Sequence, residues 1–234
     1  MKNFVIAIDG PAGAGKSTVA RYVAKKLGFL YVDTGAMYRA LTLKAINEKI
    51  PFSDEKKLIE MAKNTEIELQ DNNTGYRVLL DGKDVSEAIR TEEVSKGTHF
   101  IASILPIREI LWRMQRQLRE KYDIVMEGRD IGSKVFPDAQ LKIFLDASVK
   151  ERAKRRYLQL KEMGIEGDLI TIEKEIIERD EKDKKRSISP LVRHPDAFYI
   201  DTTGMTIEEV IERIINLYNQ VVKKSPDYNP RVKA

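Results

Sequence analysis

The 234-residue sequence contains no cysteine, two histidines and a single tryptophan. Without cysteine there can be no disulfide, no thiolate zinc site and no cysteine nucleophile, and so few histidines exclude a histidine-rich metal centre. No apolar run approaches the ~20 residues that a membrane-spanning helix needs. The apolar stretch near the N-terminus is only about five residues long, shorter than the core of a secretory signal. We therefore expect a cytoplasmic protein with no membrane partner.

A strong charge of one sign is also lacking. The chain has 41 basic and 37 acidic residues, a net charge of +4, and a hydrophobic fraction of 42% that is ordinary for a globular protein. A modest positive charge suits either nucleic acid or a small polyanion such as a nucleotide phosphate. Because there is no one-sided basic block and no platform of interleaved aromatic residues, we expect no nucleic-acid partner.

Short apolar runs alternate with amphipathic segments along most of the chain. Residues 4–8 read FVIAI, a continuous apolar run typical of a strand covered on both faces. Residues 16–27 follow with helical spacing, and capping-box patterns at Ser148 and Thr206 open two later helices. This alternation predicts an α/β fold with a parallel sheet. Further strands are expected at 29–32, 124–126, 142–145 and 198–200, and helices at 36–47, from 148 to about 163, and from 206 onward.

Two segments depart from the alternation. Residues 65–85 alternate in polarity around turn signals at 71–75 and 81–82, which predicts a small antiparallel insert. Residues 150–186 hold 12 basic and 10 acidic residues among 37, so we do not expect them in the core. They form either a solvated helical pair or a mobile, arginine-rich lid over an anionic ligand. We expect a single domain, 1–234, that includes both segments, with a frayed tail from 225 to 234.

The segment from Gly10 to Ser17 matches the phosphate-loop pattern G-x-x-x-x-G-K-[ST] in full. Its glycines let the backbone N–H groups wrap a phosphate, and the following helix N-terminus adds partial positive charge. Lys16 is expected to reach the β- and γ-phosphates, and the Ser17 hydroxyl to ligate Mg²⁺. No N-K-x-D guanine reader occurs, so a small phosphotransferase suits the chain better than a GTPase. The predicted ATP-binding residues are Gly10, Pro11, Ala12, Gly13, Ala14, Gly15, Lys16, Ser17 and Thr18.

Three further motifs accompany the loop: DTGAMYR at 33–39, EGRDIG at 127–132 and ERDEKDKKR at 178–186. Together with the loop they resemble the bacterial cytidylate kinases, within the nucleoside monophosphate kinases, over residues 6–223. The resemblance implies a P-loop kinase fold with a five-stranded parallel sheet flanked by helices. It also implies ATP as donor, CMP or dCMP as acceptor, a cytoplasmic monomer, a helical lid at 150–186, and an insert at 65–85 beside the CMP site.

The resemblance also assigns an acceptor-phosphate site. Arg39, Arg129 and Arg186 match the arginines that hold the CMP phosphate, a role suited to a planar and permanently charged guanidinium. Arg179 and Asp183 match the sugar contacts. The alternative, from the sequence alone, is that Asp183 is a helix-face carboxylate paired at i+3 with Arg186.

The cytosine base is assigned to Arg108 and Asp130 by the same resemblance, although Asp130 alone could simply order its turn. A serine that often touches the base in the family has no counterpart here, where the chain carries Thr98 and His99. Either residue substitutes for it, or the local alignment shifts. The predicted CMP-binding residues are Thr34, Arg39, Arg108, Arg129, Asp130, Arg179, Asp183 and Arg186.

Arg152, Arg155 and Arg156 share the helix that opens at Ser148, and they could cover the transferring phosphoryl in a closed lid. An acceptor phosphate is already ionised, so the reaction needs positioning and charge neutralisation and no general base. Two alternatives stay open: a P-loop kinase of a small-molecule hydroxyl, with Asp33 as base, and a nucleotide-dependent regulatory or RNA-binding protein. The predicted catalytic residues are Lys16, Arg129, Arg155 and Arg156, with Ser17 as the metal ligand.

Overall fold

The computed structural model describes residues 3–72, 75–162, 164 and 166–224. The chain divides into two compact units, the first formed by residues 1–31 and 121–234 and the second by residues 32–120. The tail that was expected to fray, 225–234, lies outside the described residues. The expected single domain stays a prediction.

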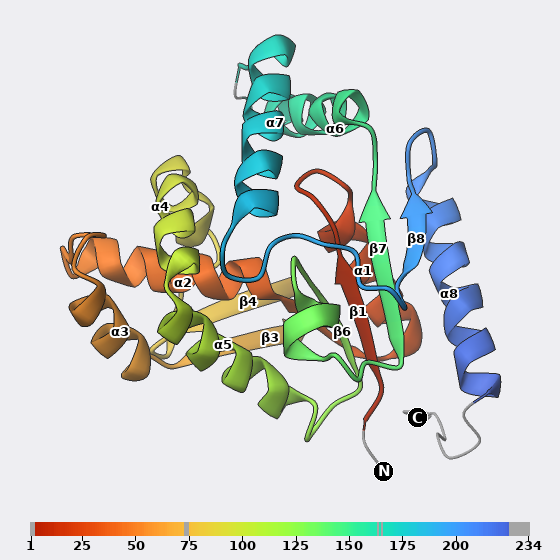
Figure 1. Cartoon of the computed structure of the whole chain (residues 1–234), viewed down its shortest axis with the longest axis horizontal. Coiled ribbons are helices and arrows are strands. Elements are labelled where there is room, and N and C mark those ends of the chain that lie inside the picture. Colours follow the sequence, from red (N-terminus) through yellow and green to blue (C-terminus); the bar gives the residue numbers. More distant parts are fainter. Residues whose placement is uncertain (1–2, 73–74, 163, 165, 225–234) are drawn as a thin grey trace. The chain divides into compact units, whose positions relative to one another are not determined.

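A five-stranded parallel sheet with the strand order β2-β6-β1-β7-β8 confirms the predicted α/β fold (Figure 1). All five residues of the central strand β1 are buried, and β6 pairs with one of its edges and β7 with the other. Complete burial explains why its sequence is a continuous apolar run. The strands are β1 (Val5–Asp9), β2 (Leu30–Asp33), β6 (Ile124–Gly128), β7 (Leu141–Asp146) and β8 (Phe198–Asp201).

Helices α1 (Lys16–Leu27) and α8 (Ile207–Lys223) pack against each other beside the strands of the first unit. The rings of Phe4, Phe29 and Tyr218 meet there, with centroids 5.1–6.1 Å apart. The predicted capping box at the start of α8 is present, since the Thr206 side chain accepts the Glu209 N–H and the Glu209 carboxylate accepts the Thr206 N–H. None of the helices within the described ranges is long and apolar enough to cross a membrane.

The charge-dense segment forms a helical hairpin of α6 (Val149–Glu162) and α7 (Leu169–Lys185) (Figure 1). It has a small apolar core of its own, in which Ala153, Ile172 and Ile176 are buried. Gly164, at φ +72, follows the end of α6, which was expected near residue 163. The expectation that this segment contributes nothing to a core is therefore wrong in part, because its apolar residues form a small core between the two helices.

The second unit is built on α2 (Thr34–Asn47), whose Ala36 and Ala40 pack against a small antiparallel sheet. This sheet confirms the predicted insert, and its turn at Asp81 and Gly82 has φ of 48° and 77°, as in a tight hairpin. The alternation of strand and helix patterns in the sequence did not predict three of the helices in this second unit. The remaining elements are β3 (Ile67–Asn72), β4 (Gly75–Leu80), β5 (Lys83–Asp84), α3 (Glu55–Lys63), α4 (Glu92–Ser103) and α5 (Leu105–Leu118).

Candidate active site

The phosphate loop connects the carboxyl end of β1 to the first turn of α1. Gly10 has a φ of 151°, and a Cβ added there would lie 1.9 Å from the carbonyl oxygen of Leu145. A side chain at this position would therefore collide with the backbone of β7. Gly13 and Gly15 also have positive φ, 79° and 86°, which turns the loop around a space facing the helix N-terminus.

Lys16 is buried in this loop, and its Nζ donates to the carbonyl oxygen of Pro11 at 2.8 Å. Burial lowers the pKa of Lys16 to about 7, and the guanidinium group of Arg129 adds to the effect. Glu127 and Asp9 act in the opposite direction. The ammonium group is therefore placed where a polyphosphate would supply the negative charge that stabilises it.

Ser17 donates its hydroxyl to the Glu127 carboxylate at 2.6 Å. Glu127 is buried at the end of β6, next to the loop. Mg²⁺ prefers oxygen ligands, and the Ser17 hydroxyl and the Glu127 carboxylate are two adjacent oxygen groups. In kinases, most of the other Mg²⁺ ligands are waters and substrate phosphates. Among the described residues there is no cluster of three or more side chains able to hold a metal. The role of Ser17 as a metal ligand stays a prediction.

Asp183 on α7 holds two of the predicted acceptor arginines. Its Oδ2 accepts from Arg129 Nε at 2.9 Å, and its Oδ1 accepts from Arg186. Burial acts to raise the pKa of Asp183, but the charges of Arg129 and Arg186 outweigh it and hold that pKa below its ordinary value. The pair at i+3 with Arg186 that the sequence indicated is present, and the contact of Asp183 with the sugar stays a prediction.

Arg152 is the most deeply buried of the three candidate lid arginines. Its guanidinium donates to three different elements: to the Ala147 carbonyl after β7 at 2.9 Å, to the Ala12 carbonyl in the phosphate loop at 3.1 Å, and to the Asp180 carboxylate on α7 at 2.6 Å. Each bond ties the hairpin to another part of the first unit. Arg152 thus fastens the helical hairpin to the phosphate loop.

The two predicted catalytic arginines of α6 have different surroundings. Arg155 donates to the hydroxyl and the carbonyl of Thr202 at 3.0 and 2.7 Å and to Glu151 at 3.0 Å. A Cβ added to Gly15 would lie 3.8 Å from Arg155 Nη1, which brings this side chain to the phosphate loop. Arg156 donates to Gln159 at the surface. Their catalytic role stays a prediction.

In the second unit, Arg39 is held by Asp33, whose Oδ2 accepts from Arg39 at 2.9 Å while its Oδ1 caps α2 at the Ala36 N–H. This double use of Asp33 argues against the alternative in which it acts as a base toward a hydroxyl. Thr34 is buried at the first position of α2.

Arg108 lies in the same unit and is 1% exposed. Its guanidinium carbon is 5.4 Å from the ring centroid of Tyr38 and 5.5 Å from that of Trp112, and it donates to the Ala102 carbonyl at 2.9 Å. These contacts hold the guanidinium in one orientation. The predicted contact of Arg108 with cytosine stays a prediction.

The two residues that stand near the missing family serine differ in environment. Thr98 donates back to the Val94 carbonyl at 2.6 Å and contacts Thr42, whereas His99 is exposed with its Nδ1 2.7 Å from the Lys96 carbonyl. Both side chains are already engaged within α4 or with α2. These contacts do not favour either Thr98 or His99 as the replacement for the family serine.

The structure thus gathers the donor residues and part of the acceptor set in the first unit. Exposed Arg179 belongs there too, because its charge acts on both Lys16 and Asp183. Asp130 lies in the turn after β6, and it is buried. The second unit holds Thr34, Arg39 and Arg108.

Three groups near these residues escaped the sequence reasoning: Glu127, which binds Ser17; Asp180, which binds Arg152; and Asp9, which binds the turn after β6. Glu127 and Asp180 stand inside motifs that were singled out, so their proximity to an assigned residue was a usable signal. Asp9 precedes the phosphate loop directly. A carboxylate at the end of a fully apolar strand was the signal in that case.

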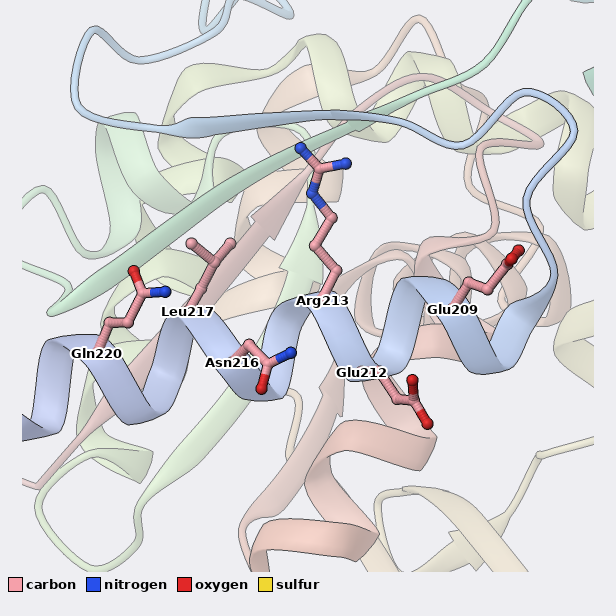
Figure 2. Close-up of a pocket in the computed structure, with 6 residues that line it drawn as sticks. All are labelled: Glu209, Glu212, Arg213, Asn216, Leu217 and Gln220. Atoms are coloured by element: carbon pink, nitrogen blue, oxygen red, sulfur yellow. The ribbon is translucent and has the colours of Figure 1, made fainter.

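A shallow hollow of about 390 Å³ runs along α8 (Figure 2). It has none of the loop's converging N–H groups, because a single helix supplies every side chain that lines it. We assign no ligand to it. The lining residues are Glu209, Glu212, Arg213, Asn216, Leu217 and Gln220.

A complete phosphate loop at the carboxyl end of the central strand of a parallel sheet, followed directly by a helix, defines the class of P-loop nucleotide-binding proteins. A crystal structure of an uncharacterized protein from Eubacterium ventriosum has the same fold, with a TM-score of 0.54 at 13% identity over 94% of this chain and 99% of that one.

Sequence comparison then gives the family. Residues 6–220 match the family model described as cytidylate kinase. Cytidylate kinase from Alkaliphilus oremlandii is 52% identical over 92% of this chain and 98% of its own length, and that from Desulfitobacterium hafniense is 50% identical over 95% of each. The chain belongs to the cytidylate kinase family. This membership confirms the resemblance seen in the four motifs.

Proposed function

We propose that this protein transfers the γ-phosphoryl group of ATP to CMP or dCMP and releases ADP with CDP or dCDP. An oxygen of the acceptor phosphate forms the new bond to the γ-phosphorus. The bond to the β–γ bridging oxygen breaks, and its electron pair leaves with ADP. The acceptor oxygen carries no proton to remove, so the residues act by positioning and by neutralising charge.

On the donor side, the phosphate loop supplies backbone N–H groups and Lys16 supplies the charge. The contact between Lys16 Nζ and the Pro11 carbonyl would be exchanged for contacts with phosphate oxygens. Mg²⁺, bound together with ATP, would neutralise phosphate charge, and Ser17 beside Glu127 is the group that would hold it. Arg152 would keep the hairpin next to the loop while the phosphates are bound.

On the acceptor side, Arg39, Arg129 and Arg186 would bind the CMP phosphate, with Arg179 and Asp183 at the sugar. The single observation that carries the proposal is the pairing of Asp183 with Arg129 and Arg186, beside a loop that holds Lys16. Arginines fixed in advance by a carboxylate can receive a phosphate at a small further cost in side-chain entropy. A hydroxyl acceptor would need no such set of arginines.

The base would be read by Asp130 and Arg108. Cytosine presents an amino donor and two acceptors, so a carboxylate can accept from the amino group while an arginine donates to the ring. Uracil reverses this pattern at two positions, and buried polar sites reject a mismatched pattern by up to ~10⁴-fold. We therefore expect CMP to be a much better substrate than UMP.

The test is kcat/KM for CMP and UMP in the wild-type protein and in Asp130→Asn. An amide can donate to the uracil O4, so CMP should lose far more than UMP and their ratio should collapse. Equal losses for both substrates would mean that Asp130 only holds its turn. A coupled assay with a panel of nucleoside monophosphates, and with small hydroxyl compounds, separates this function from a hydroxyl kinase and from a protein that only binds nucleotide.

The protein would act as a cytoplasmic monomer that needs no nucleic-acid partner. Two features support this proposal: the net charge is only +4, and one chain carries the residues proposed to bind both ATP and CMP. Light scattering at assay concentrations should give the mass of one chain, and activity per chain should not change on dilution.

A further inference from the structure

The loop after β8 contains a buried threonine that lies outside all four sequence motifs. Thr202 is 2% exposed and directly follows Asp201, the last residue of β8. Its N–H and its hydroxyl both donate to the Asp146 carbonyl at the end of the neighbouring strand β7, at 2.8 and 3.0 Å. These two bonds fix Thr202 at the carboxyl edge of the sheet, the edge from which the phosphate loop also starts.

Thr202 also accepts hydrogen bonds from both ends of one guanidinium group. Arg155 Nη1 donates to the Thr202 hydroxyl oxygen at 3.0 Å, and Arg155 Nη2 donates to the Thr202 carbonyl oxygen at 2.7 Å. Glu151, one turn earlier on α6, accepts from Arg155 Nε at 3.0 Å. Because the guanidinium is planar, these three bonds fix its orientation as well as its position.

The guanidinium that Thr202 holds lies beside the phosphate loop. A Cβ added to Gly15 would be 3.8 Å from Arg155 Nη1, and Gly15 directly precedes α1. Arginine has five N–H donors, and the three bonds use three of them, so the group can bind a phosphate oxygen without leaving Thr202. Arg156, in contrast, is exposed and donates to Gln159 on its own helix.

We propose that Thr202 is a positioning residue for phosphoryl transfer. Its hydroxyl and carbonyl hold the Arg155 guanidinium beside the phosphate loop, where Arg155, and not Arg156, neutralises charge on the phosphoryl group in transit. The proposal rests on the proposed transfer from ATP. Thr202 itself touches no phosphate and acts through the arginine. Removing its hydroxyl should therefore change the rate of the chemical step more than the binding of either substrate.

The test is Thr202→Val, which keeps the shape of the side chain and the backbone carbonyl but removes the hydroxyl. The rate of phosphoryl transfer is measured in single turnovers, so that product release does not limit it, and KM is measured for ATP and for the acceptor. We expect the transfer rate to fall about tenfold and both KM values to stay within about threefold of wild type. Thr202→Ser, which restores the hydroxyl, should recover the rate to within about twofold.

A double-mutant cycle shows whether Thr202 acts through Arg155. Arg155→Met should lower the transfer rate about 100-fold, and about tenfold more than Arg156→Met does. In the Arg155→Met protein, Thr202→Val should have no further effect, because the group that Thr202 positions is gone. If Thr202→Val does not fold, Thr202→Ala replaces it in the same cycle.

Thr203→Val is the matched control. The Thr203 hydroxyl oxygen accepts from the Ser148 N–H at 2.9 Å, so this change also removes a hydroxyl that joins the loop after β8 to the start of α6. It leaves the acceptors of Arg155 in place. The transfer rate of this variant should stay within about twofold of wild type.

Three results would each overturn the proposal and make Thr202 a support for its loop alone: an unchanged transfer rate in Thr202→Val, an equal loss in Thr203→Val, or an additive loss in the cycle. The series uses whichever monophosphate the wild-type protein phosphorylates in the panel assay. Failure of CMP as acceptor therefore refutes the proposed substrate, while the cycle still decides the role of Thr202. A wild-type protein that phosphorylates nothing in the panel refutes both.

Discussion

The phosphate loop and the three arginines proposed to bind the acceptor phosphate are built in opposite ways. The loop is one continuous stretch whose shape depends on three glycines with positive φ and on one buried lysine. The arginines come from separate elements, and each is held by a carboxylate: Arg39 by Asp33, and Arg129 and Arg186 by Asp183. The shape of the phosphate loop is therefore encoded by one local stretch of sequence. The arrangement of the three arginines depends on tertiary ion pairs between residues that are far apart in the sequence or on different elements.

The largest expected effect tests the local half of this comparison. Lys16→Met should lower kcat by about 10³-fold or more while leaving the fold intact, because it removes the one charge that the loop places at the phosphates. Lys25→Met, at an exposed position near the end of the same helix, is the control and should keep full activity. A Lys16→Met protein with a tenth of wild-type kcat would contradict the assignment.

This difference also explains what could be predicted from the sequence. The loop, the strand β1 and the capping box of α8 are local patterns, and all were predicted correctly. The pairing of Arg129 with Asp183 and that of Ser17 with Glu127 join residues 54 and 110 positions apart. No local pattern specifies such pairs. Without the family resemblance, Arg39, Arg129 and Arg186 would have been interpreted as ordinary surface residues.

The next prediction separates the two kinds of carboxylate by their response to pH. Burial raises the pKa of Asp9 from 3.8 to about 6, and the charge of Asp130 also acts to raise it. The hydrogen bonds that Asp9 accepts from the Gly132 and Ile131 N–H groups act to lower this pKa, as does the charge of Lys16. Between these values the folded state binds more protons, so this contribution to stability is present at low pH and is lost as the pH rises through 6. It amounts to about 3 kcal/mol at most.

The measurement is urea unfolding from about pH 2.5 to 7, comparing wild type with Asp9→Asn. Relative to that variant, the wild-type free energy of unfolding should fall as the pH rises. Asp183 should behave in the opposite way, because its pKa is lowered: relative to Asp183→Asn, wild type should lose stability as the pH falls below the ordinary range of aspartate. The same sign for both carboxylates would refute the distinction between them.

A smaller effect concerns the pairing of the acceptor arginines. Asp183→Ala should raise the CMP KM by about 30-fold and the ATP KM by less than about threefold, because Arg129 and Arg186 lose their common partner. Glu181→Ala, two positions away and paired with Lys185 at the surface, is the control and should change neither constant. Equal changes in both constants would make Asp183 a structural residue only.

The smallest expected effect concerns Arg152, which links the locally encoded phosphate loop to a tertiary ion pair on α7. Its three bonds join the loop carbonyl of Ala12, the end of β7 and Asp180 on α7. Lysine has one donor centre in place of the planar fork, so Arg152→Lys cannot keep all three. The ATP KM should rise by about five- to tenfold, since the hairpin no longer holds the loop, while the CMP/UMP ratio stays unchanged.

Hydrogen exchange provides the second measurement for this variant. In wild type, the amides of residues 150–186 should become protected when a bisubstrate inhibitor fills both sites, as expected if the hairpin acts as a lid. In Arg152→Lys the gain in protection should be smaller for both α6 and α7, because Asp180 loses the contact that links α7 to the loop. Identical protection with and without inhibitor in wild type would refute the lid. Full protection in the variant would mean that the apolar contacts of Ala153, Ile172 and Ile176 hold the hairpin in place by themselves.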